Sequence, residues 1–284
     1  MELGGTKTVW AVGDGSGPPR EHGEFPTSAP RETLERALAC ITAAASVSAV
    51  GVGAFGPIDL VSGTVLETPK QAWRGAEVLA IVRELARVPV GLDTDVGAAA
   101  LGENRFGAGR GLSDCVYITV GTGIGGAAIA DGSIVHGAGH SEMGHVHVPH
   151  HTRDIETGFK GVCRYHPDGC LEGLACGPAI AARHGAPADE LPSDHEAWES
   201  ESHYLAYAIA NLIVTLRPQR IILGGGVMAA DGLRRRVQHK LVPLVNPDYV
   251  RIGDGSDFVM APGLARLSGV TGAILLAEQA LGAS

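Results

Sequence analysis

The chain has 284 residues, of which 45% are hydrophobic and 19% charged, so it can form two lobes or one large domain of ordinary globular composition. Its net charge of −9 excludes nucleic acid as a main partner, because binding to a phosphate backbone needs a basic surface. The chain shows no signal peptide and no apolar run of transmembrane length, and its odd number of cysteines, five, suits a reducing compartment, so we expect a cytoplasmic protein without a membrane partner.

The chain begins with a tight glycine turn, Gly4-Gly5-Thr6-Lys7, followed by a predicted strand over Thr8 to Val12. Backbone N–H groups of such a turn can face a phosphate, but a plain hairpin turn explains the same residues equally well. Only Met1 to Leu3 remain to form the strand that should lead into this turn. A further strand is predicted over Arg20 to Thr27.

Strands and helices alternate in the next part of the chain. Ser28 is predicted to cap a helix that runs to about Ala45, with Pro30 in its first turn. Trp73 stands in a loop, where it either covers a ligand or packs on the lobe. The other elements predicted here are a strand over Val47–Phe55 that ends in Gly56-Pro57, a hairpin over Ile58–Glu67, a helix over Ala76–Ala86 and a strand over Val88–Leu92.

Two aspartates mark the junction between that last strand and the next helix. The chain reads Asp93-Thr94-Asp95, and an alanine-rich helix begins at once. Proteins with alternating strands and helices place their ligands at the C-terminal ends of strands, so a carboxylate at this junction is a candidate functional group. The alternative role for a single aspartate here is a helix cap.

A second glycine turn, Gly121 to Gly126, separates a strand over Ser113–Val120 from a strand that ends at Ala130. It is not a P-loop, because no Lys-Ser or Lys-Thr pair follows, and a strand after it excludes the Rossmann fingerprint. A phosphate cradle within a hairpin is the remaining functional interpretation. The later predicted elements are helices over Gly177–His184, His195–Leu216, Met228–Val245 and Leu264–Leu281, a strand over Arg220–Leu223 that enters Gly224-Gly225-Gly226, and a strand over Phe258–Ala261.

Metal-binding side chains are concentrated between His136 and Glu172, a stretch that holds seven of the twelve histidines. Its spacing Cys163-x2-His166-x3-Cys170, with more histidine upstream, fits a closed four-ligand zinc site. The metal could take part in the reaction, or it could only hold the surrounding residues in place. The candidates for the upstream ligand are His145, His147, His150 and His151.

Both halves of the chain have the predicted element order βββ-α-β-α-β-α. The metal stretch, His136 to Glu172, is inserted after the third strand of the second half. A duplicated unit with a glycine hairpin in each copy is the layout of the actin, hexokinase and Hsp70 ATPase fold, a two-lobed α/β fold of the ribonuclease H-like type. We therefore expect a small lobe of residues 1–110, joined by the C-terminal helix 265–284, and a larger lobe of residues 111–264 that contains the insertion.

Several motifs resemble, in the same order and over the whole chain, those of the ROK family of bacterial sugar kinases. They are Glu2-x-Gly-Gly-Thr-Lys7, Asp95 leading Ala98-Ala-Ala-Leu-Gly-Glu103, Gly121-Thr-Gly-Ile-Gly-Gly126, Glu142-Met-Gly-His145, Cys170-Leu-Glu172 and Gly224-Gly-Gly226. Four further features resemble the fructokinase branch of this family. They are Glu2, Phe55-Gly-Pro-Ile-Asp59, Thr68-Pro-Lys70 and Asp93-Thr-Asp95.

The resemblance implies ATP-dependent phosphorylation of a hexose, with D-fructose to fructose 6-phosphate as the expected reaction and glucose, mannose or an N-acetylhexosamine as alternatives. Asp95 matches the general base, which takes the proton of the attacking hydroxyl. The implied sugar-binding residues are Gly56, Pro57, Thr94, Glu142, His145 and Glu172. The implied nucleotide-binding residues are Gly4, Gly5, Thr6, Lys7, Thr119, Gly121, Thr122, Gly123, Gly125, Pro178, Gly224 and Gly225, with Mg²⁺ held mostly by ATP oxygens and water.

The same resemblance implies a homodimer and assigns zinc to His145, Cys163, His166 and Cys170. Such a zinc is structural, since four protein ligands leave no open position. Thr94 and Gly97 stand where many relatives carry asparagine, which leaves the sugar preference open. A sugar-responsive regulator of the same family is a weaker alternative, because such regulators bind DNA and this chain is acidic. A zinc hydrolase would leave both glycine turns unexplained.

Overall fold

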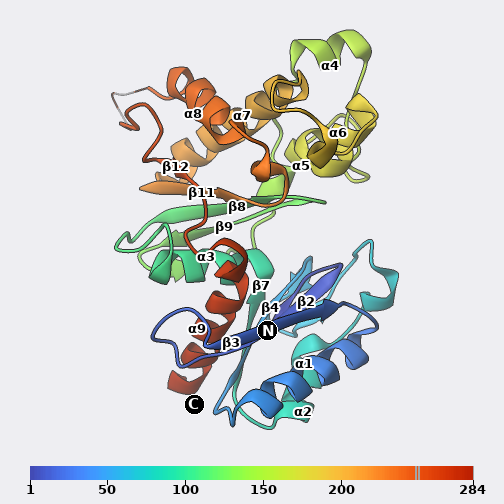
Figure 1. Ribbon diagram of the computed structural model, residues 1–284, viewed down its shortest axis with the longest axis vertical. Coiled ribbons are helices and arrows are strands. Elements are labelled where there is room, and N and C mark those ends of the chain that lie inside the picture. The colour runs from blue at the N-terminus through green and yellow to red at the C-terminus, as the bar shows by residue number, and fades with distance from the viewer. Residues whose placement is uncertain (247, 249, 284) are drawn as a thin grey trace. The chain divides into compact units, whose positions relative to one another are not determined.

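The structure is a computed structural model that describes residues 1–246, 248 and 250–283. It contains two compact units (Figure 1). The first unit comprises Met1–Gly111, Ser133–Ser141 and Gly263–Ser284, and the second comprises Leu112–Gly132 and Glu142–Pro262. The segment Ser133–Ser141 therefore belongs to the first unit, whereas the sequence boundaries assigned it to the second lobe. The reason is that its side chains contact helices and turns of the first unit, as described below.

The first unit is built on a five-stranded sheet with the order β3-β2-β1-β4-β7. β1 contains only two residues, yet it is paired on both sides: Glu2 lies opposite Val9 in the antiparallel neighbour and opposite Gly53 in the parallel one. The few residues ahead of the first glycine turn are thus enough to anchor it. The strands are β1 (Glu2–Leu3), β2 (Lys7–Val12), β3 (Glu21–Pro26), β4 (Val50–Ala54) and β7 (Val90–Thr94).

Helices cover both faces of this sheet, as the alternation along β4 shows. Val50, Val52 and Ala54 point into a core shared with α1 and α2. Gly51 faces the other way, where an added Cβ would come within 1.7 Å of the Ala273 carbonyl oxygen in α9. Because side chains alternate along a strand, large residues fill one face while glycine lets α9 lie directly on the other. The helices are α1 (Pro30–Ala44), α2 (Val78–Ala86), α3 (Asp95–Phe106) and α9 (Ser268–Gly282).

Smaller elements complete the first unit. They are the hairpin β5 (Ile58–Asp59) and β6 (Thr64–Val65), and the 3-10 turns Gln71–Trp73 and Ala265–Leu267. Trp73 is fully buried, and its indole N–H donates to the Ser28 carbonyl at 2.8 Å, so its role is packing. The prediction that Ser28 caps α1 is wrong. Ala29 occupies that position, while the Ser28 N–H donates to the Thr33 hydroxyl at 2.9 Å.

The second five-stranded sheet has the order β10-β9-β8-β11-β12, the same arrangement as β3-β2-β1-β4-β7 in the first sheet. These strands are β8 (Cys115–Val120), β9 (Ile124–Ala130), β10 (Ser133–Ile134), β11 (Arg220–Gly224) and β12 (Val259–Met260). Its helices are α4 (Thr152–Thr157), α5 (Leu171–Ala175), α6 (Gly177–His184), α7 (Ala197–Leu216) and α8 (Leu233–Leu241), with 3-10 turns at Met143–His145, Ala188–Glu190, Val227–Ala229 and Val242–Leu244.

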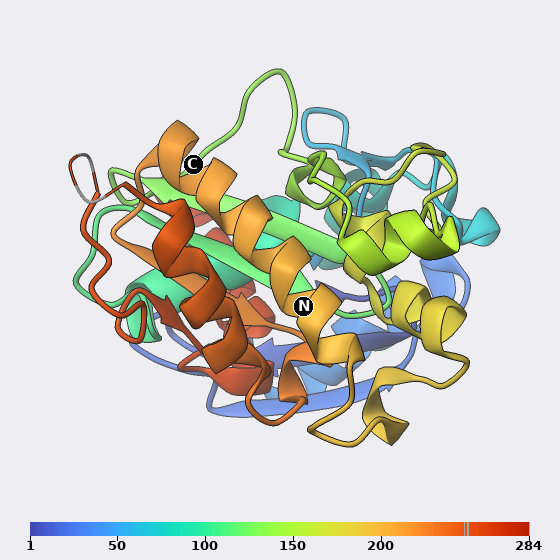
Figure 2. The same cartoon turned by 90° about the horizontal axis from the view of Figure 1, so that it is seen from above.

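The long helices α7 and α8 lie side by side (Figure 2). The single helix predicted over Met228–Val245 is divided into α8 and two flanking 3-10 turns. Gly232, with φ at 75°, stands just before α8, and Pro243 follows it, so both ends carry residues that interrupt a helix. None of the helices described, α7 included, is both long and apolar enough to cross a bilayer.

A buried ion pair fastens the metal stretch to α6 and α7. Arg183 donates from Nε to both oxygens of Asp154, at 2.9 and 3.1 Å, and both side chains are almost fully buried. The Tyr204 hydroxyl donates to the same carboxylate at 2.6 Å. Burial, together with this hydrogen bond, raises the pKa of Tyr204, so its hydroxyl remains a donor. Arg183 also donates to the Leu174 carbonyl at 2.6 Å and thereby holds α5.

We expect Asp154→Ala to lower the free energy of unfolding by about 3–5 kcal/mol, because it leaves the Arg183 guanidinium buried without its carboxylate. Urea unfolding followed by circular dichroism measures the effect. Asp168→Ala is the control, because Asp168 pairs with Lys160 at the surface and its removal should leave stability almost unchanged. Equal losses in the two variants would contradict a special role for the buried pair.

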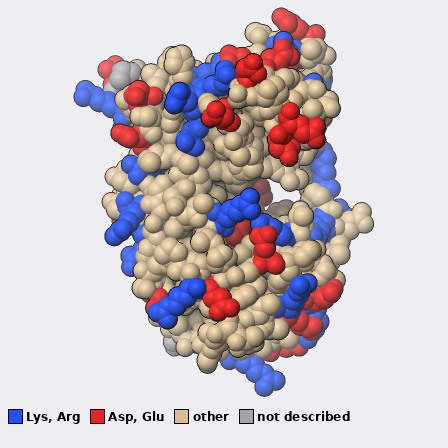
Figure 3. Space-filling view, in the orientation of Figure 1, with Lys and Arg blue, Asp and Glu red and all other residues tan. Residues whose placement is uncertain are grey.

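Acidic and basic side chains are interspersed on the face shown in Figure 3. Exposed ion pairs occur within each unit, such as Arg31 with Glu84 at 2.6 Å and Lys160 with Asp168 at 3.3 Å. Water screens such pairs, so they contribute little to stability. The stability of both units must come mainly from their buried contacts.

Candidate active site and metal centre

The first glycine turn connects β1 and β2. The Gly4 N–H donates to the Lys7 carbonyl at 3.0 Å, and the Thr27 hydroxyl donates to the Gly4 carbonyl at 2.8 Å. Gly5 and Thr6 are exposed, whereas the Lys7 ammonium pairs with Glu24 on β3 at 2.6 Å. The turn is therefore closed on itself, and it presents a backbone segment and a hydroxyl to solvent.

Lys70 brings a second positive charge to this turn. Its ammonium donates to the Gly5 carbonyl and, at 3.3 Å, to the Thr27 carbonyl. Lys70 was not among the predicted site residues, although Thr68-Pro69-Lys70 was one of the motifs that carried the resemblance. Its place beside the turn depends on a contact across 65 residues, which local patterns do not reveal.

Asp95 is the first residue of α3, directly after β7. Its carboxylate is partly exposed, and its Oδ1 accepts the Val96 N–H at 2.9 Å. A helix N-terminus favours a negative charge, so this position supports an ionised carboxylate. Thr94 caps α3: it is only 4% exposed, and its hydroxyl accepts the Gly97 N–H at 2.9 Å. The sugar contact predicted for Thr94 stays a prediction.

The Gly56-Pro57 turn lies at the same edge of the sheet as Asp95. β4 and β7 are parallel neighbours, and Ala54 lies opposite Thr94, so the residues that follow both strands emerge together. The peptide bond between Gly56 and Pro57 is cis. The Ile58 N–H that follows donates to Nε2 of His140 at 3.2 Å.

The second unit brings together its predicted nucleotide-binding residues around the second glycine turn. The Gly177 N–H, at the start of α6 beside Pro178, donates to the Gly121 carbonyl at 2.7 Å. Gly225 has a φ of 97°, and an added Cβ there would come within 2.3 Å of the Val120 carbonyl oxygen. The end of β8, the start of α6 and the glycines after β11 therefore converge. The predicted residues in these segments are Thr119, Gly121, Thr122, Gly123, Gly125, Pro178, Gly224 and Gly225.

Two of the predicted sugar-binding side chains of the second unit, His145 and Glu172, lie close to one another, and Glu172 also contacts the second glycine turn. Glu142 precedes the 3-10 turn Met143–His145, and the His145 N–H donates to the Glu142 carbonyl at 2.9 Å. Glu172 accepts the Ile124 N–H at 2.9 Å through Oε2, while its Oε1 is 4.0 Å from Nε2 of His145. Glycine at 123 leaves room for this carboxylate, since an added Cβ would lie 2.7 Å from Oε2.

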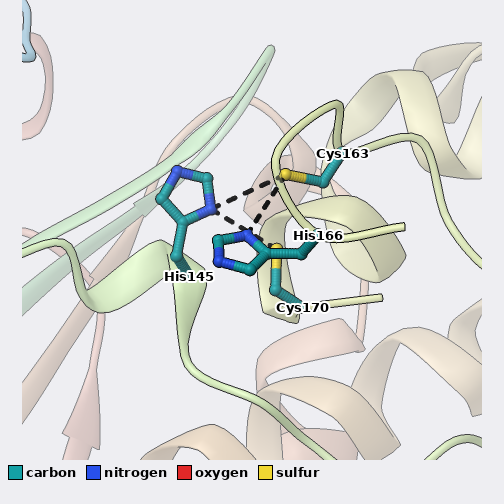
Figure 4. A group of neighbouring side chains, drawn as sticks. All are labelled: His145, Cys163, His166 and Cys170. Atoms are coloured by element: carbon teal, nitrogen blue, oxygen red, sulfur yellow. Dashed lines mark hydrogen bonds between the residues drawn. The ribbon is translucent and has the colours of Figure 1, made fainter. Parts of the chain in front are cut away.

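The four predicted metal ligands form one cluster (Figure 4), in which all ligand atoms lie within 4.8 Å of one another. Nδ1 of His145 is 3.4 Å from Sγ of Cys170 and 3.8 Å from Sγ of Cys163, which is 3.6 Å from Nδ1 of His166. Tetrahedral zinc, with bonds of about 2.0–2.3 Å, separates its ligand atoms by about 3.3–3.8 Å. The cluster could therefore hold a metal ion of this kind.

The rival histidines have other partners. Nε2 of His150 is 2.8 Å from the Asp168 carbonyl, and Nδ1 of His151 accepts the Arg153 N–H at the start of α4. The His147 ring stands edge-on to His166, with 5.5 Å between the ring centroids. The structure thus places His145 in the cluster with the two cysteines.

The chemistry of the cluster also fits a cation. Burial raises the pKa of Cys170 to about 12, so its thiol is neutral at pH 7 unless a positive charge lies beside it. A divalent metal supplies that charge and stabilises the thiolate. Two cysteines and two histidines form a donor set typical of structural zinc.

Comparisons with known proteins agree over the whole chain. The model of the ROK family matches residues 1–280. A fructokinase from Streptococcus mutans is 37% identical over 98% of this chain and 96% of its own, and one from Zymomonas mobilis is 38% identical over 98% and 95%. A ROK hexokinase from Thermus thermophilus superposes with a TM-score of 0.83 at 26% identity, over 100% of this chain and 98% of that one. The predicted α/β fold of the actin and hexokinase type is confirmed.

Proposed function

Because the chain belongs to the ROK family, we propose that it transfers the γ-phosphoryl group of ATP to a hydroxyl of a hexose. The observation that carries this proposal is the partly exposed carboxylate of Asp95 at the junction of β7 and α3. D-fructose is the proposed acceptor and fructose 6-phosphate the product, since the relatives named fructokinase match nearly the whole chain.

In this reaction Asp95 acts as the general base. A sugar hydroxyl must lose its proton as it attacks the γ-phosphate, and a carboxylate within hydrogen-bond reach can accept it. The N-terminus of α3 favours the ionised carboxylate that this step requires. Gly56 and Pro57, at the same edge of the sheet, would border the sugar.

The second unit would contribute acceptors for the sugar hydroxyls. Carboxylates suit polyols because each oxygen can accept from neighbouring hydroxyl groups. Glu142 and Glu172 would serve in this way, with His145 beside them. Zinc bound by the cluster would fix the His145 ring and leave its Nε2 on the side of Glu172.

The two glycine turns would bind the phosphates of ATP. In the first unit these residues are Gly4, Gly5, Thr6 and Lys7. In the second unit the turn after β8 would bind phosphate, and Pro178, Gly224 and Gly225 would border the adenosine. Mg²⁺ would supply positive charge to the phosphates, held mostly by ATP oxygens and water. The proposal includes a homodimer in the cytoplasm, which analytical ultracentrifugation and cell fractionation would test.

An ATP-coupled assay across fructose, glucose, mannose and N-acetylhexosamines tests the function directly. We expect the highest kcat/KM with fructose and a product that phosphoglucose isomerase consumes. A higher kcat/KM for glucose or mannose would show that this sugar, and not fructose, is the preferred substrate. No turnover of any hexose, with ATP and Mg²⁺ present and the fold intact, would reject the sugar kinase.

A further inference from the structure

The segment Ser133–Ser141 is grouped with the first unit, although the residues before and after it belong to the second. Side chains near its start, middle and end attach it to the first unit. Near the start, Ile134 packs on the core formed by Ala98 and Leu101 of α3 with residues of α9. The other two attachments are made by His136 and His140, and both reach turns that the proposed function assigns to the sugar.

His136 reaches the turn that carries Asp95. Its Nε2 lies 2.7 Å from Oδ2 of Asp93, and the Asp93 side chain is only 7% exposed. The other oxygen of Asp93 accepts the Thr94 N–H at 2.7 Å. The Asp93 carboxylate therefore joins His136 on one side to the backbone just before Asp95 on the other.

Gly97 makes this arrangement possible. An added Cβ at this position would lie 2.1 Å from Oδ1 of Asp93 and 2.9 Å from Oγ1 of Thr94. Any side chain here would push the Asp93 carboxylate away from the Thr94 N–H. The contact between His136 and the turn thus depends on a glycine in the first turn of α3.

His140 reaches the turn after β4. Its Nε2 accepts the Ile58 N–H at 3.2 Å, and its ring lies 3.4 Å from where a Cβ of Gly56 would stand. Because Ala54 and Thr94 are neighbours in the sheet, the two turns reached by His136 and His140 share one edge. One short segment therefore contacts both turns.

We propose that His136 and His140 are positioning residues for the acceptor sugar: His136, through Asp93, fixes the turn that carries Asp95, and His140 fixes the Gly56-Pro57 turn. This inference rests on the proposed sugar kinase function. Neither histidine accepts the proton in the reaction. Each holds a backbone turn in place, so its loss should affect the sugar and leave ATP binding largely unchanged.

Steady-state kinetics of His136→Ala, His140→Ala and Gly97→Ala test the proposal. Misplacing a reacting group by about 1 Å costs up to about 100-fold, so we expect kcat/KM for the sugar to fall about 10-fold or more, with the ATP KM changed less than about twofold. In His136→Gln the amide can still donate to Asp93, and in His140→Gln the amide oxygen can still accept from Ile58, so both should recover most of the activity. His22→Gln, an exposed histidine on β3, is the matched control.

Hydrogen exchange by mass spectrometry separates this inference from the proposed function. We expect faster exchange at residues 93–97 in His136→Ala and at residues 56–60 in His140→Ala, whether or not the wild-type protein phosphorylates a hexose. If exchange there is unchanged, the positioning role is wrong even in an active kinase. Sugar and ATP KM values that rise together, or glutamine variants as impaired as the alanine variants, would also overturn it.

Discussion

Asp95→Asn should lower kcat for hexose phosphorylation by about two to four orders of magnitude, because it removes the group proposed to accept the hydroxyl proton. The substitution keeps the shape of the side chain, and the cap on α3 comes from Thr94, so the fold should persist. KM for the sugar should change far less than kcat, since the amide can still hydrogen-bond a hydroxyl. Initial rates at saturating ATP, together with a melting curve of the variant, measure both effects.

Asp14→Asn is a suitable control, because Asp14 is an exposed aspartate of the same unit whose Oδ1 accepts from Ser16 in a surface turn. It should have wild-type kinetics. An Asp95→Asn protein that turns over at a near-normal rate would remove Asp95 from the mechanism. One that has lost its melting transition would require Asp95→Glu as a second variant, which keeps the carboxylate and should retain partial activity.

Removing the proposed zinc should lower the melting temperature by about 10 °C or more, because the cluster of His145, Cys163, His166 and Cys170 would then no longer tie together separate turns of the second unit. Cys170→Ser should copy this loss, since it removes a fully buried ligand. Sugar affinity should fall in both cases, because Glu172 follows Cys170 by two residues and lies 4.0 Å from His145. Metal analysis, calorimetry and sugar titration measure the three effects.

Cys40→Ser provides the matched control, since Cys40 is a half-buried cysteine on α1 outside the cluster. It should keep both the metal content and the melting temperature of the wild type. A Cys170→Ser protein that contains no zinc yet melts and binds sugar like the wild type would contradict the structural role. Zinc retained in full by that variant would show that Cys170 is not a ligand.

Features that depend on neighbouring residues were predictable from the sequence. The glycine turns after β1 and β8, and the strand-to-helix junction at Asp95, follow from glycine clusters and from hydrophobic runs that end in polar residues. The cysteine and histidine spacing likewise indicated three members of the metal cluster, because short chelating loops are local. The fourth, His145, lies 18 residues before Cys163 and needed the resemblance.

Contacts across long stretches of chain were not predictable in the same way. Nothing near Asp93 indicates that its partner is His136, 43 residues later, and nothing near Lys70 indicates Gly5. Some local errors have simple causes. Gly232 and Pro243 interrupt the helix predicted over Met228–Val245, and α1 begins one residue later than predicted, so that the Ala29 carbonyl, and not Ser28, accepts the Thr33 N–H.

The packing of α9 on β4 also affects how this protein folds during synthesis. The face of the first sheet that bears Gly51 is covered by α9, which is translated only after the residues of the second unit. At about 5–20 residues per second, the residues between Gly111 and Ser268 take roughly 10–30 s to synthesise. During that time α1 and α2 can cover one face of the sheet, whereas the other face has only α3, packed at Gly53, and lacks α9. The nascent chain should therefore expose an apolar surface to chaperones until α9 leaves the ribosome and closes the first unit.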